Sequence, residues 1–414
     1  MSPSGRVSTR ARTLSDILAP EANSFGVVRL AMAAAVLISH SFWFASGSGA
    51  NEPMYAITGF SLGEHAVQVF FFLSGVLVAQ SFDKGRSVLD FAVARALRIF
   101  PGLIVCVFAT ALGIGLAVTT MGGEAYLADP GLNAYIIKTI ALVSGSVPLP
   151  GVFEALPLPG LFNVSLWTLK YEVLCYCGLA VLGVFGLFRA RYRIVATVLL
   201  GLFIGACAAV LPVGPHAFTM PQNIAYFFLT FTTGVAAYLV RDWLPVHWGP
   251  FVVLFLAAAA AISTPWQILA TALFLGYATI GFASCRFGGL TSWTRRNDLS
   301  FGLYIYAAPI QQALIQCWPG IDPYALSVAA LMLTLPCAAL SWSLVERPAL
   351  SMRSKAVSVL RSGLRMNPKH PGAPKPRIAA ALRHPRGLTG TQLNQRMGRA
   401  SKSYRRARGS LTAA

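Results

Sequence analysis

Residues 24–44 read SFGVVRLAMAAAVLISHSFWF, an apolar run that is long enough to cross a lipid bilayer. Arg29 and His40 are the ionisable residues of this run. Ionisable side chains are costly inside a membrane, where they usually face a cavity or a partner instead of lipid. The run therefore predicts a membrane helix that carries functional groups.

Arg29 and His40 are eleven positions apart. On an α-helix this spacing places both side chains within about 20° on one face and roughly 16 Å apart along the axis. We expect Arg29 near the cytoplasmic side and His40 in the outer half, where together they would line one shared cavity. The alternative is that Arg29 extends to the inner interface and His40 only satisfies a hydrogen bond between packed helices.

The composition of the whole chain supports a membrane location. Of its 414 residues, 56% are hydrophobic and 11% are charged, whereas soluble domains carry about 25% charged residues. Apolar runs of spanning length predict an all-α integral membrane protein with about ten transmembrane helices. The predicted spans are 25–44, 63–82, 99–120, 163–188, 194–212, 222–240, 249–264, 266–285, 300–318 and 324–345.

The charged residues between the spans predict the orientation. One set of loops carries Lys84, Arg86, 189–193 and other basic residues, while the opposite set carries mostly Glu and Asp. Because basic loops favour the cytoplasm, both termini are predicted to be cytoplasmic. The long outer segment 121–162 is rich in Gly and Pro, and we expect it to form a loop with one short helix near 131–143.

Three regions are predicted: a cytoplasmic N-terminal segment at 1–24, a transmembrane domain at 25–350 and a basic, disordered cytoplasmic tail at 351–414. The first apolar run is too long for a signal peptide and contains Arg29, so we expect it to be retained. Fifteen of the chain's 33 basic residues and none of its 14 acidic residues follow Ser351. We favour a topology anchor for this tail, then binding to anionic lipids. Since the excess charge is confined mostly to the tail, no nucleic-acid partner is expected.

The seven cysteines lie nearly all within apolar runs. We expect them to be buried small hydrophobic residues, with no disulfide framework and no metal site.

A second group of polar residues lies within residues 63–101, GEHAVQVFFFLSGVLVAQSFDKGRSVLDFAVARALRIFP. Gln68 interrupts a Phe-rich helix, and Ser74 with Gly75 would allow a second helix to approach closely. Arg95 and Arg98 share one face of a helix that we expect to begin just before Pro101. Such a pair suits phosphate or pyrophosphate, although it is also ordinary for a cytoplasmic loop.

The third group lies within SLWTLKYEVLCY, residues 165–176. Trp167 is expected at the outer interface, and Glu172 several residues deeper. A lone buried carboxylate is costly, so Glu172 needs a partner or a role. Lys170 is a poor partner because side chains two positions apart do not face each other on a helix.

In their order and placement, these segments resemble the acyltransferase-3 family of multi-pass membrane O-acyltransferases, which modify bacterial surface and exported glycans. The resemblance extends from about residue 24 to 350. The matching positions are Arg29 with His40, Phe70–Gly75, Arg95 with Arg98, Ser165, Trp167, Leu169 and Glu172, LSFGLYIYAAPIQQ at 299–312, and SLVERP at 343–348.

The chain also departs from the family pattern. Many members have a histidine where Ala307 stands here, so we assign no catalytic role to that helix. Gln68 stands where the family often has Asp, and Thr168 replaces the commoner Ser.

The resemblance implies a cytoplasmic acyl-CoA donor, most often acetyl-CoA, and a sugar hydroxyl acceptor. Arg95 and Arg98 would hold the CoA phosphates, and Arg29 would bind phosphate or stabilise negative charge. His40 would act as general base because its unperturbed pKa is near 6.5, with a transient acyl-histidine as the alternative. Glu172 would orient the imidazole or stabilise its protonated form.

The same resemblance implies further partners and a location. Trp167, Gln68 and Ser74 are expected to bind substrate, the acceptor would be a glycan or lipid-linked sugar, and the protein would lie in a bacterial inner membrane. The competing hypothesis is a polytopic transporter or flippase for a glycan or lipid. The sequence shows no matching pair of Gly- or Pro-broken helices in two halves, the usual indication of a transporter site.

Overall fold

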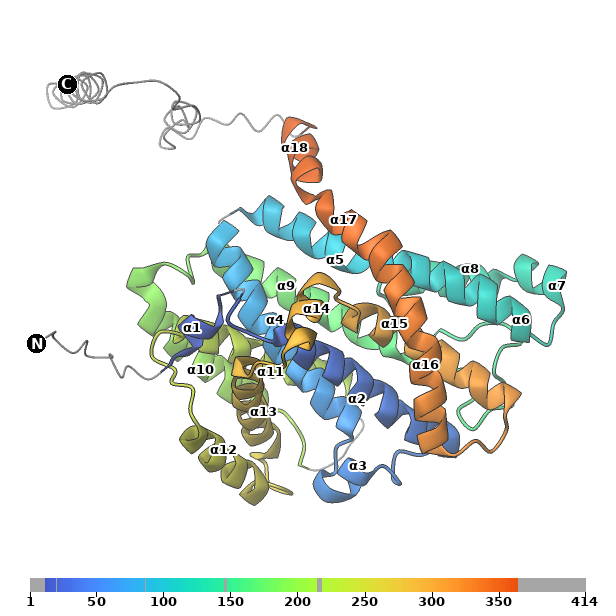
Figure 1. The fold of residues 1–414 in the computed structure, drawn as a ribbon, viewed down its shortest axis with the longest axis horizontal. Coiled ribbons are helices and arrows are strands. Elements are labelled where there is room, and N and C mark those ends of the chain that lie inside the picture. Colours follow the sequence, from blue (N-terminus) through green and yellow to red (C-terminus); the bar gives the residue numbers. More distant parts are fainter. Residues whose placement is uncertain (1–11, 20, 86, 145–146, 214–217, 364–414) are drawn as a thin grey trace, which may run out of the picture. The chain divides into compact units, whose positions relative to one another are not determined.

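The structure, a computed structural model, describes residues 12–19, 21–85, 87–144, 147–213 and 218–363 (Figure 1). Contacts divide the chain into two units, Met1–Leu360 and Arg361–Ala414. Within the described residues the fold is helical, with one isolated bridge between Thr13 and Pro245. This confirms the predicted all-α class.

The α-helices of the described residues are α1 Leu14–Ile17, α2 Phe25–Ser46, α3 Pro53–Thr58, α4 Leu62–Gly85, α5 Val88–Ala109, α6 Leu116–Val118, α7 Gly123–Ala128, α8 Pro130–Ile140, α9 Leu169–Val184, α10 Arg193–Ala209, α11 Met220–Leu239, α12 Trp248–Ala260, α13 Gln267–Ser284, α14 Gly289–Arg296, α15 Ser300–Cys317, α16 Pro323–Ser341, α17 Arg347–Ser351 and α18 Arg353–Gly363. Shorter 3₁₀ or π segments are Thr110–Gly115, Val164–Thr168, Ala190–Tyr192 and Trp342–Glu346.

Seven helical stretches of the described chain are long and apolar enough to cross a membrane, which fits a multi-pass membrane protein. They are Phe25–Ser46, Leu62–Gly85, Val88–Val118, Val164–Val184, Ala190–Ala209, Gln267–Ser284 and Pro323–Ser351. The other three predicted spans correspond to α11, α12 and α15, which fall outside this set; α12 has only 13 residues. The number of ten and the cytoplasmic termini therefore stay predictions.

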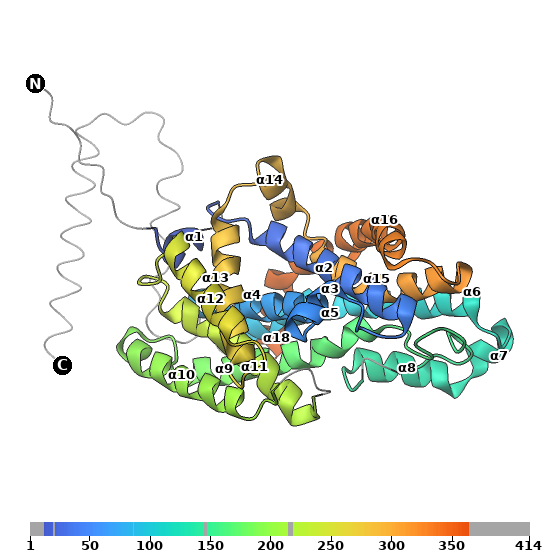
Figure 2. The same cartoon turned by 90° about the horizontal axis from the view of Figure 1, so that it is seen from below.

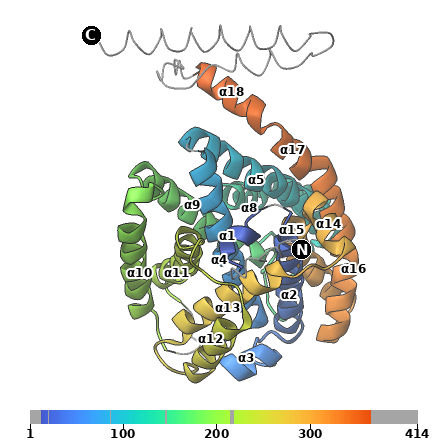
Figure 3. The ribbon, with the colours of Figure 1, turned by 60° about the vertical axis from the view of Figure 1, so that its left-hand side comes forward.

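Helix α4 lies in the middle of the bundle and contacts α2, α5, α9, α11 and α13 (Figure 3). Its closest neighbour is α11, where Gly75 faces Gly234. A Cβ added to Gly75 would lie 2.1 Å from the Phe231 carbonyl oxygen, and one added to Gly234 would lie 2.2 Å from that of Phe72. Only glycine permits this backbone approach, as expected for the Ser74-Gly75 pair.

Helix α15 contains Pro309, which has no N–H for the carbonyl of Ile305 one turn earlier. The side chain of Asn163 replaces the missing donor, because its Nδ2 lies 2.9 Å from that carbonyl oxygen. The thiol of Cys106 donates to the same oxygen at 3.3 Å. These bonds fix α15 against α5 and the segment that precedes α9.

The prediction that a helix begins just before Pro101 is wrong. Helix α5 begins at Val88, capped by the Ser87 side chain, which accepts from the Asp90 amide. Arg95 and Arg98 consequently lie inside the helix, and Pro101 is an interior residue. The first three turns of α5 contain charged residues that interrupt the apolar run, so the apolar pattern did not indicate that the helix begins at Val88.

The segment 121–162, predicted to lie on the outer side, contains two short helices, α7 and α8, where one was expected. Figure 2 shows both at the end of the bundle opposite α1. Helix α8 matches the predicted stretch near 131–143. The additional helix α7 is only six residues long, too short to give a clear apolar period.

The cysteines differ in burial, so the expectation that all are buried is wrong. Cys106, Cys175 and Cys207 are buried, Cys337 is intermediate, and Cys177, Cys285 and Cys317 are exposed; all seven are free thiols. Apolar helices of a membrane protein also place small residues on the outer surface, which an apolar run does not distinguish from the interior.

The boundaries predicted at residues 24 and 350 stay predictions. Within the predicted tail, α18 is a described helix at Arg353–Gly363. The predicted disorder of the remainder, 364–414, falls outside the described residues.

Candidate active site

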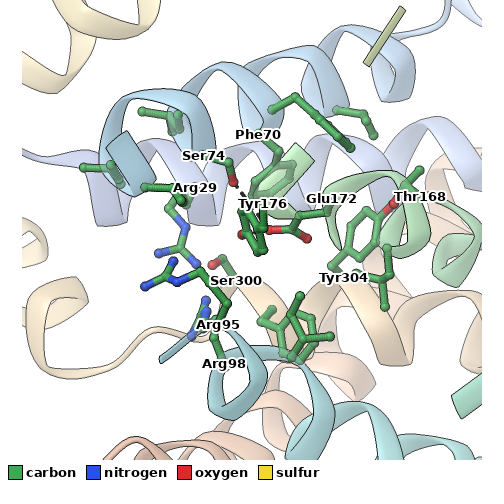
Figure 4. A pocket seen from close by; sticks show the side chains of 18 residues that line it. Arg29, Phe70, Ser74, Arg95, Arg98, Thr168, Glu172, Tyr176, Ser300 and Tyr304 are labelled. Atoms are coloured by element: carbon green, nitrogen blue, oxygen red, sulfur yellow. Dashed lines mark hydrogen bonds between the residues drawn. The ribbon is translucent and has the colours of Figure 1, made fainter. Parts of the chain in front are cut away.

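Three arginines from two helices meet at one end of an internal cavity, which we call the arginine chamber (Figure 4). Arg29 comes from α2, and Arg95 and Arg98 come from α5. Ser74 and Glu172 line the middle of the same chamber. Its volume is about 120 Å³, so it is a narrow space with a strongly basic end.

Asp298 bridges two of the arginines. Its Oδ2 lies 2.9 Å from Nη1 of Arg29 and 2.9 Å from Nη2 of Arg98. Burial raises the pKa of the Asp298 carboxyl, but the two guanidinium groups outweigh burial and hold that pKa well below its usual value. Asp298 is therefore an anion held between two cations.

Helix α14 brings Asp298 to this position. It packs on the start of α2, where Gly26 leaves room for Thr294: a Cβ at Gly26 would lie 2.9 Å from the Thr294 hydroxyl oxygen. The hydroxyls of Ser24 and Thr291 also share a hydrogen bond of 2.8 Å. After α14 the chain turns directly into Asp298, whose Oδ1 accepts from the Ser300 hydroxyl at 2.6 Å.

Glu346 is a second carboxylate beside Arg98. It is 1% exposed, and its Oε2 lies 3.7 Å from Nη1 of Arg98, an ion pair too long for a hydrogen bond. Its Oε1 accepts from the Ser341 hydroxyl at 2.9 Å. Glu346 ends a π-helical segment, a local irregularity that often marks functional sites.

Arg95 differs from the other two arginines because no ion pair engages it among the described residues. Its guanidinium lies 5.7 Å from the ring centroid of Tyr176, and its buried Nε has no hydrogen-bond partner. Arg95 is thus the guanidinium of the chamber best able to receive an anion.

Glu172 has partners on the arginine-chamber side. Its Oε1 accepts a short hydrogen bond from the Tyr176 hydroxyl and a longer one, 3.4 Å, from the Ser74 hydroxyl. The expected need for a partner is met by these groups. No hydrogen bond joins Glu172 to His40 in the described structure.

His40 lies in a second, larger cavity, which we call the histidine chamber. Its volume is about 710 Å³, and Trp43, Trp167 and Lys170 also line it. The His40 ring lies 6.2 Å from that of Trp43 and 5.5 Å from that of Phe44. Its Nδ1 is buried and has no hydrogen-bond partner among the described residues.

Arg29 and His40 therefore line two adjoining cavities, and the expectation of one shared cavity is wrong. Both side chains do lie on the inner side of α2, as their spacing predicts. Three residues line both chambers and so lie at the boundary between them: Val67, Thr168 and Tyr304. Tyr304 approaches from α15, a contact that the spacing along α2 does not reveal.

The remaining predicted site residues fall in different places. Ser74 lines the arginine chamber and Trp167 lines the histidine chamber. Gln68 lines neither: it is 3% exposed, and its side chain lies 3.4 Å from the ring of His65.

Sequence reasoning missed Asp298, Tyr176 and Tyr304. For Asp298 a signal was present, because it is a lone acidic residue in a loop otherwise dominated by arginine. Tyr304 lies within the stretch 299–312 and Tyr176 within 165–176, but neither was singled out because tyrosines are common in apolar helices.

The fold and the chambers define a helical membrane protein in which an arginine-rich cavity adjoins a larger cavity lined by a histidine. The profile of a family described as an acyltransferase domain matches residues 23–343. The chain therefore belongs to the acyltransferase-3 family of membrane O-acyltransferases, which confirms the resemblance and favours an enzyme over a transporter.

Two curated proteins are similar over most of the chain. An "O-acetyl transferase" of Shigella phage Sf6 is 31% identical over 353 residues, covering 82% of this chain and 99% of the relative. "Nodulation protein 10" of Rhizobium leguminosarum bv. viciae is 28% identical over 364 residues, covering 81% and 95%. No solved structure matches significantly.

Proposed function

We propose that this enzyme moves an acetyl group from cytoplasmic acetyl-CoA to a sugar hydroxyl of an exported or cell-surface glycan, in the inner membrane of a bacterium. The observation that carries the proposal is the division of the site. An arginine cluster suited to phosphates lies in one chamber, and a histidine with an unpartnered ring nitrogen lies in the next. The name of the phage relative, "O-acetyl transferase", supports an acetyl group and an oxygen acceptor.

The arginine chamber fits the donor. Arg95 lacks an acidic partner and would bind a CoA phosphate directly, while Arg29 and Arg98 supply further positive charge. Pockets for drug-sized ligands have roughly 300–1,000 Å³, so about 120 Å³ admits a slender chain and excludes a nucleotide. The nucleotide end would stay at the mouth while the acyl-pantetheine arm enters.

The histidine chamber fits the acceptor. Its volume of about 710 Å³ is within the range of small-molecule pockets. Trp43, Trp167 and Tyr171 offer aromatic faces for the apolar face of a sugar ring, and Asn223 and Lys170 offer polar contacts. A glycan or lipid-linked sugar from the outer side would place a hydroxyl beside His40.

In this mechanism His40 takes the proton of the acceptor hydroxyl as that oxygen attacks the acyl carbon. The bond between the acyl carbon and the CoA sulfur then breaks, and the leaving thiolate takes up a proton. Glu172 acts on the donor side, because its hydrogen bonds to Tyr176 and Ser74 fix the wall that faces Arg95. Gln68 would act indirectly, by holding the start of α4.

The test is incorporation of radiolabelled acetyl groups from acetyl-CoA into the glycan fraction of bacterial membranes that contain the protein. Membranes with the wild type should incorporate label, and His40→Ala should lose about 10²–10⁴-fold of the rate. His247→Gln is the matched control, since His247 caps α12 and lines neither chamber. Full activity of a folded His40→Ala protein would refute the assigned base, and no incorporation by the wild type would refute the function.

A further inference from the structure

The wall between the two chambers contains one direct hydrogen bond, between Thr168 and Tyr304. The two hydroxyl oxygens lie 2.7 Å apart, and both side chains line both chambers. Thr168 ends the 3₁₀ segment before α9, and Tyr304 comes from α15. Figure 4 shows this pair at the end of the arginine chamber away from the arginines.

This position is where a donor and an acceptor from opposite chambers would meet. Thr168 and Tyr304 are 5% and 9% exposed, so the polar pair is almost closed off from solvent. A group that moved from the arginines towards His40 along this boundary would meet these two hydroxyls. Their hydrogen bond would then have to open, or its partners would have to exchange, for a reaction to take place here.

We propose that the Thr168–Tyr304 bond closes the passage in the empty enzyme, and that the Tyr304 hydroxyl then bonds the carbonyl oxygen of the acyl group being transferred. The inference rests on the proposed acyl transfer. As the acceptor oxygen bonds to the acyl carbon, negative charge grows on the carbonyl oxygen, and the Tyr304 hydroxyl donates to it. The carbon–sulfur bond breaks, the acceptor proton goes to His40, and the CoA thiolate takes up a proton.

The surroundings suit both states of the pair. The Tyr304 ring meets Phe70 edge-on at 6.0 Å between centroids, and the Asn163 side chain donates to the carbonyl oxygen of the next residue, Ile305. Released Thr168 would keep an acceptor, because its hydroxyl already lies 3.5 Å from the Ser165 carbonyl oxygen. When the Thr168–Tyr304 bond opens and the acyl carbonyl is bound, both hydroxyls therefore keep a hydrogen-bond partner.

The experiment compares variants of the full chain in nanodiscs and in membranes. Tyr304→Phe keeps the ring and removes only the hydroxyl. Thr168→Val removes the hydroxyl that bonds to Tyr304, and Thr168→Ser retains it. Tyr306→Phe is the matched control, a buried tyrosine of the same helix that lines neither chamber. The readouts are CoA binding, acetyl incorporation into glycan, and release of CoA thiol from acetyl-CoA without acceptor.

Tyr304→Phe should bind CoA as the wild type does and lose about 10²–10³-fold of the transfer rate, as when a donor to a developing oxyanion is removed. Thr168→Val should raise acceptor-independent CoA release, because water from the histidine chamber reaches the thioester, while Thr168→Ser should not. Wild-type transfer by Tyr304→Phe, or unchanged CoA release by Thr168→Val, would overturn the inference. Absence of transfer by the wild type would instead refute the proposed function.

Discussion

Asp298 Oδ2 lies 2.9 Å from Nη1 of Arg29, one of the three arginines that line the arginine chamber. The same oxygen also reaches Arg98. An anionic ligand that enters the chamber must share these guanidinium groups with Asp298 or displace it. We therefore expect Asp298 to stabilise the protein without ligand and to compete with the anionic donor proposed above.

Asp298→Asn separates these two effects. Without the carboxylate, Arg29 and Arg98 repel each other, so we expect a loss of about 1–3 kcal/mol in the stability of the empty protein. Because the competing carboxylate of Asp298 is gone, CoA should bind more tightly. Adding CoA should therefore raise the melting temperature of the variant by more than it raises that of the wild type. Thermal unfolding in nanodiscs, with and without CoA, measures both. Equal stability of the two empty proteins would contradict the bridging role.

The same pair predicts a pH dependence. The folded pKa of Asp298 lies below its unfolded value of about 3.9, so its stabilisation is complete above the unfolded pKa and is lost as pH falls through the folded pKa. The difference in melting temperature between wild type and Asp298→Asn should be constant from about pH 8 to pH 5 and shrink towards pH 3. A difference that grows on acidification would refute this assignment.

Because α4 and α11 cross so closely, we expect one methyl group added at Gly75 to lower the stability of the protein strongly. Gly75→Ala would place its Cβ against the Phe231 carbonyl oxygen, a backbone atom that cannot move aside. Overpacking of this kind costs about 1–3 kcal/mol or more. Gly281→Ala is the control. Gly281 also lies within a helix, but a Cβ added to it would meet no atom within 4 Å. This substitution should therefore be neutral or slightly stabilising. Size-exclusion profiles and thermal unfolding should separate the two, and equal behaviour would contradict the close crossing.

The contact between Asn163 and α15 predicts coupling to Pro309. Asn163→Ala leaves the Ile305 carbonyl without its side-chain amide donor and should cost about 1–3 kcal/mol. In the Pro309→Ala background the helix regains its own N–H for that carbonyl, so Asn163→Ala should cost clearly less. A double-mutant cycle on melting temperature measures the difference, and additive effects would show that Asn163 does not replace the missing donor.

Most of the fold follows from apolar length alone. The predicted runs at 25–44 and 63–82 correspond closely to α2 and α4, because a membrane leaves the helix as the simplest way to pair every backbone group. The start of α5 was missed because its first turns combine charged residues with an apolar face. Helix α14 was missed for a similar reason, being short and ending in two arginines.

The site was less accessible to sequence reasoning. Residues on one helix, such as Arg29 and His40, could be placed on a common face from their spacing. Contacts between distant segments could not: Thr168 and Tyr304 are separated by 136 positions, and neither residue type is unusual in a membrane helix. That contact lies at the boundary between two chambers, where one cavity was expected.

The most direct test of the two-chamber account is calorimetric CoA binding to wild type, Arg95→Gln, Arg191→Gln and His40→Gln in nanodiscs. Arg191 is a matched control, because it also lies against a tyrosine ring but outside the chambers. We expect binding by the wild type, a loss of at least about tenfold in affinity in Arg95→Gln, and unchanged affinity in Arg191→Gln and His40→Gln. No binding by the wild type, or a loss in His40→Gln without one in Arg95→Gln, would contradict it.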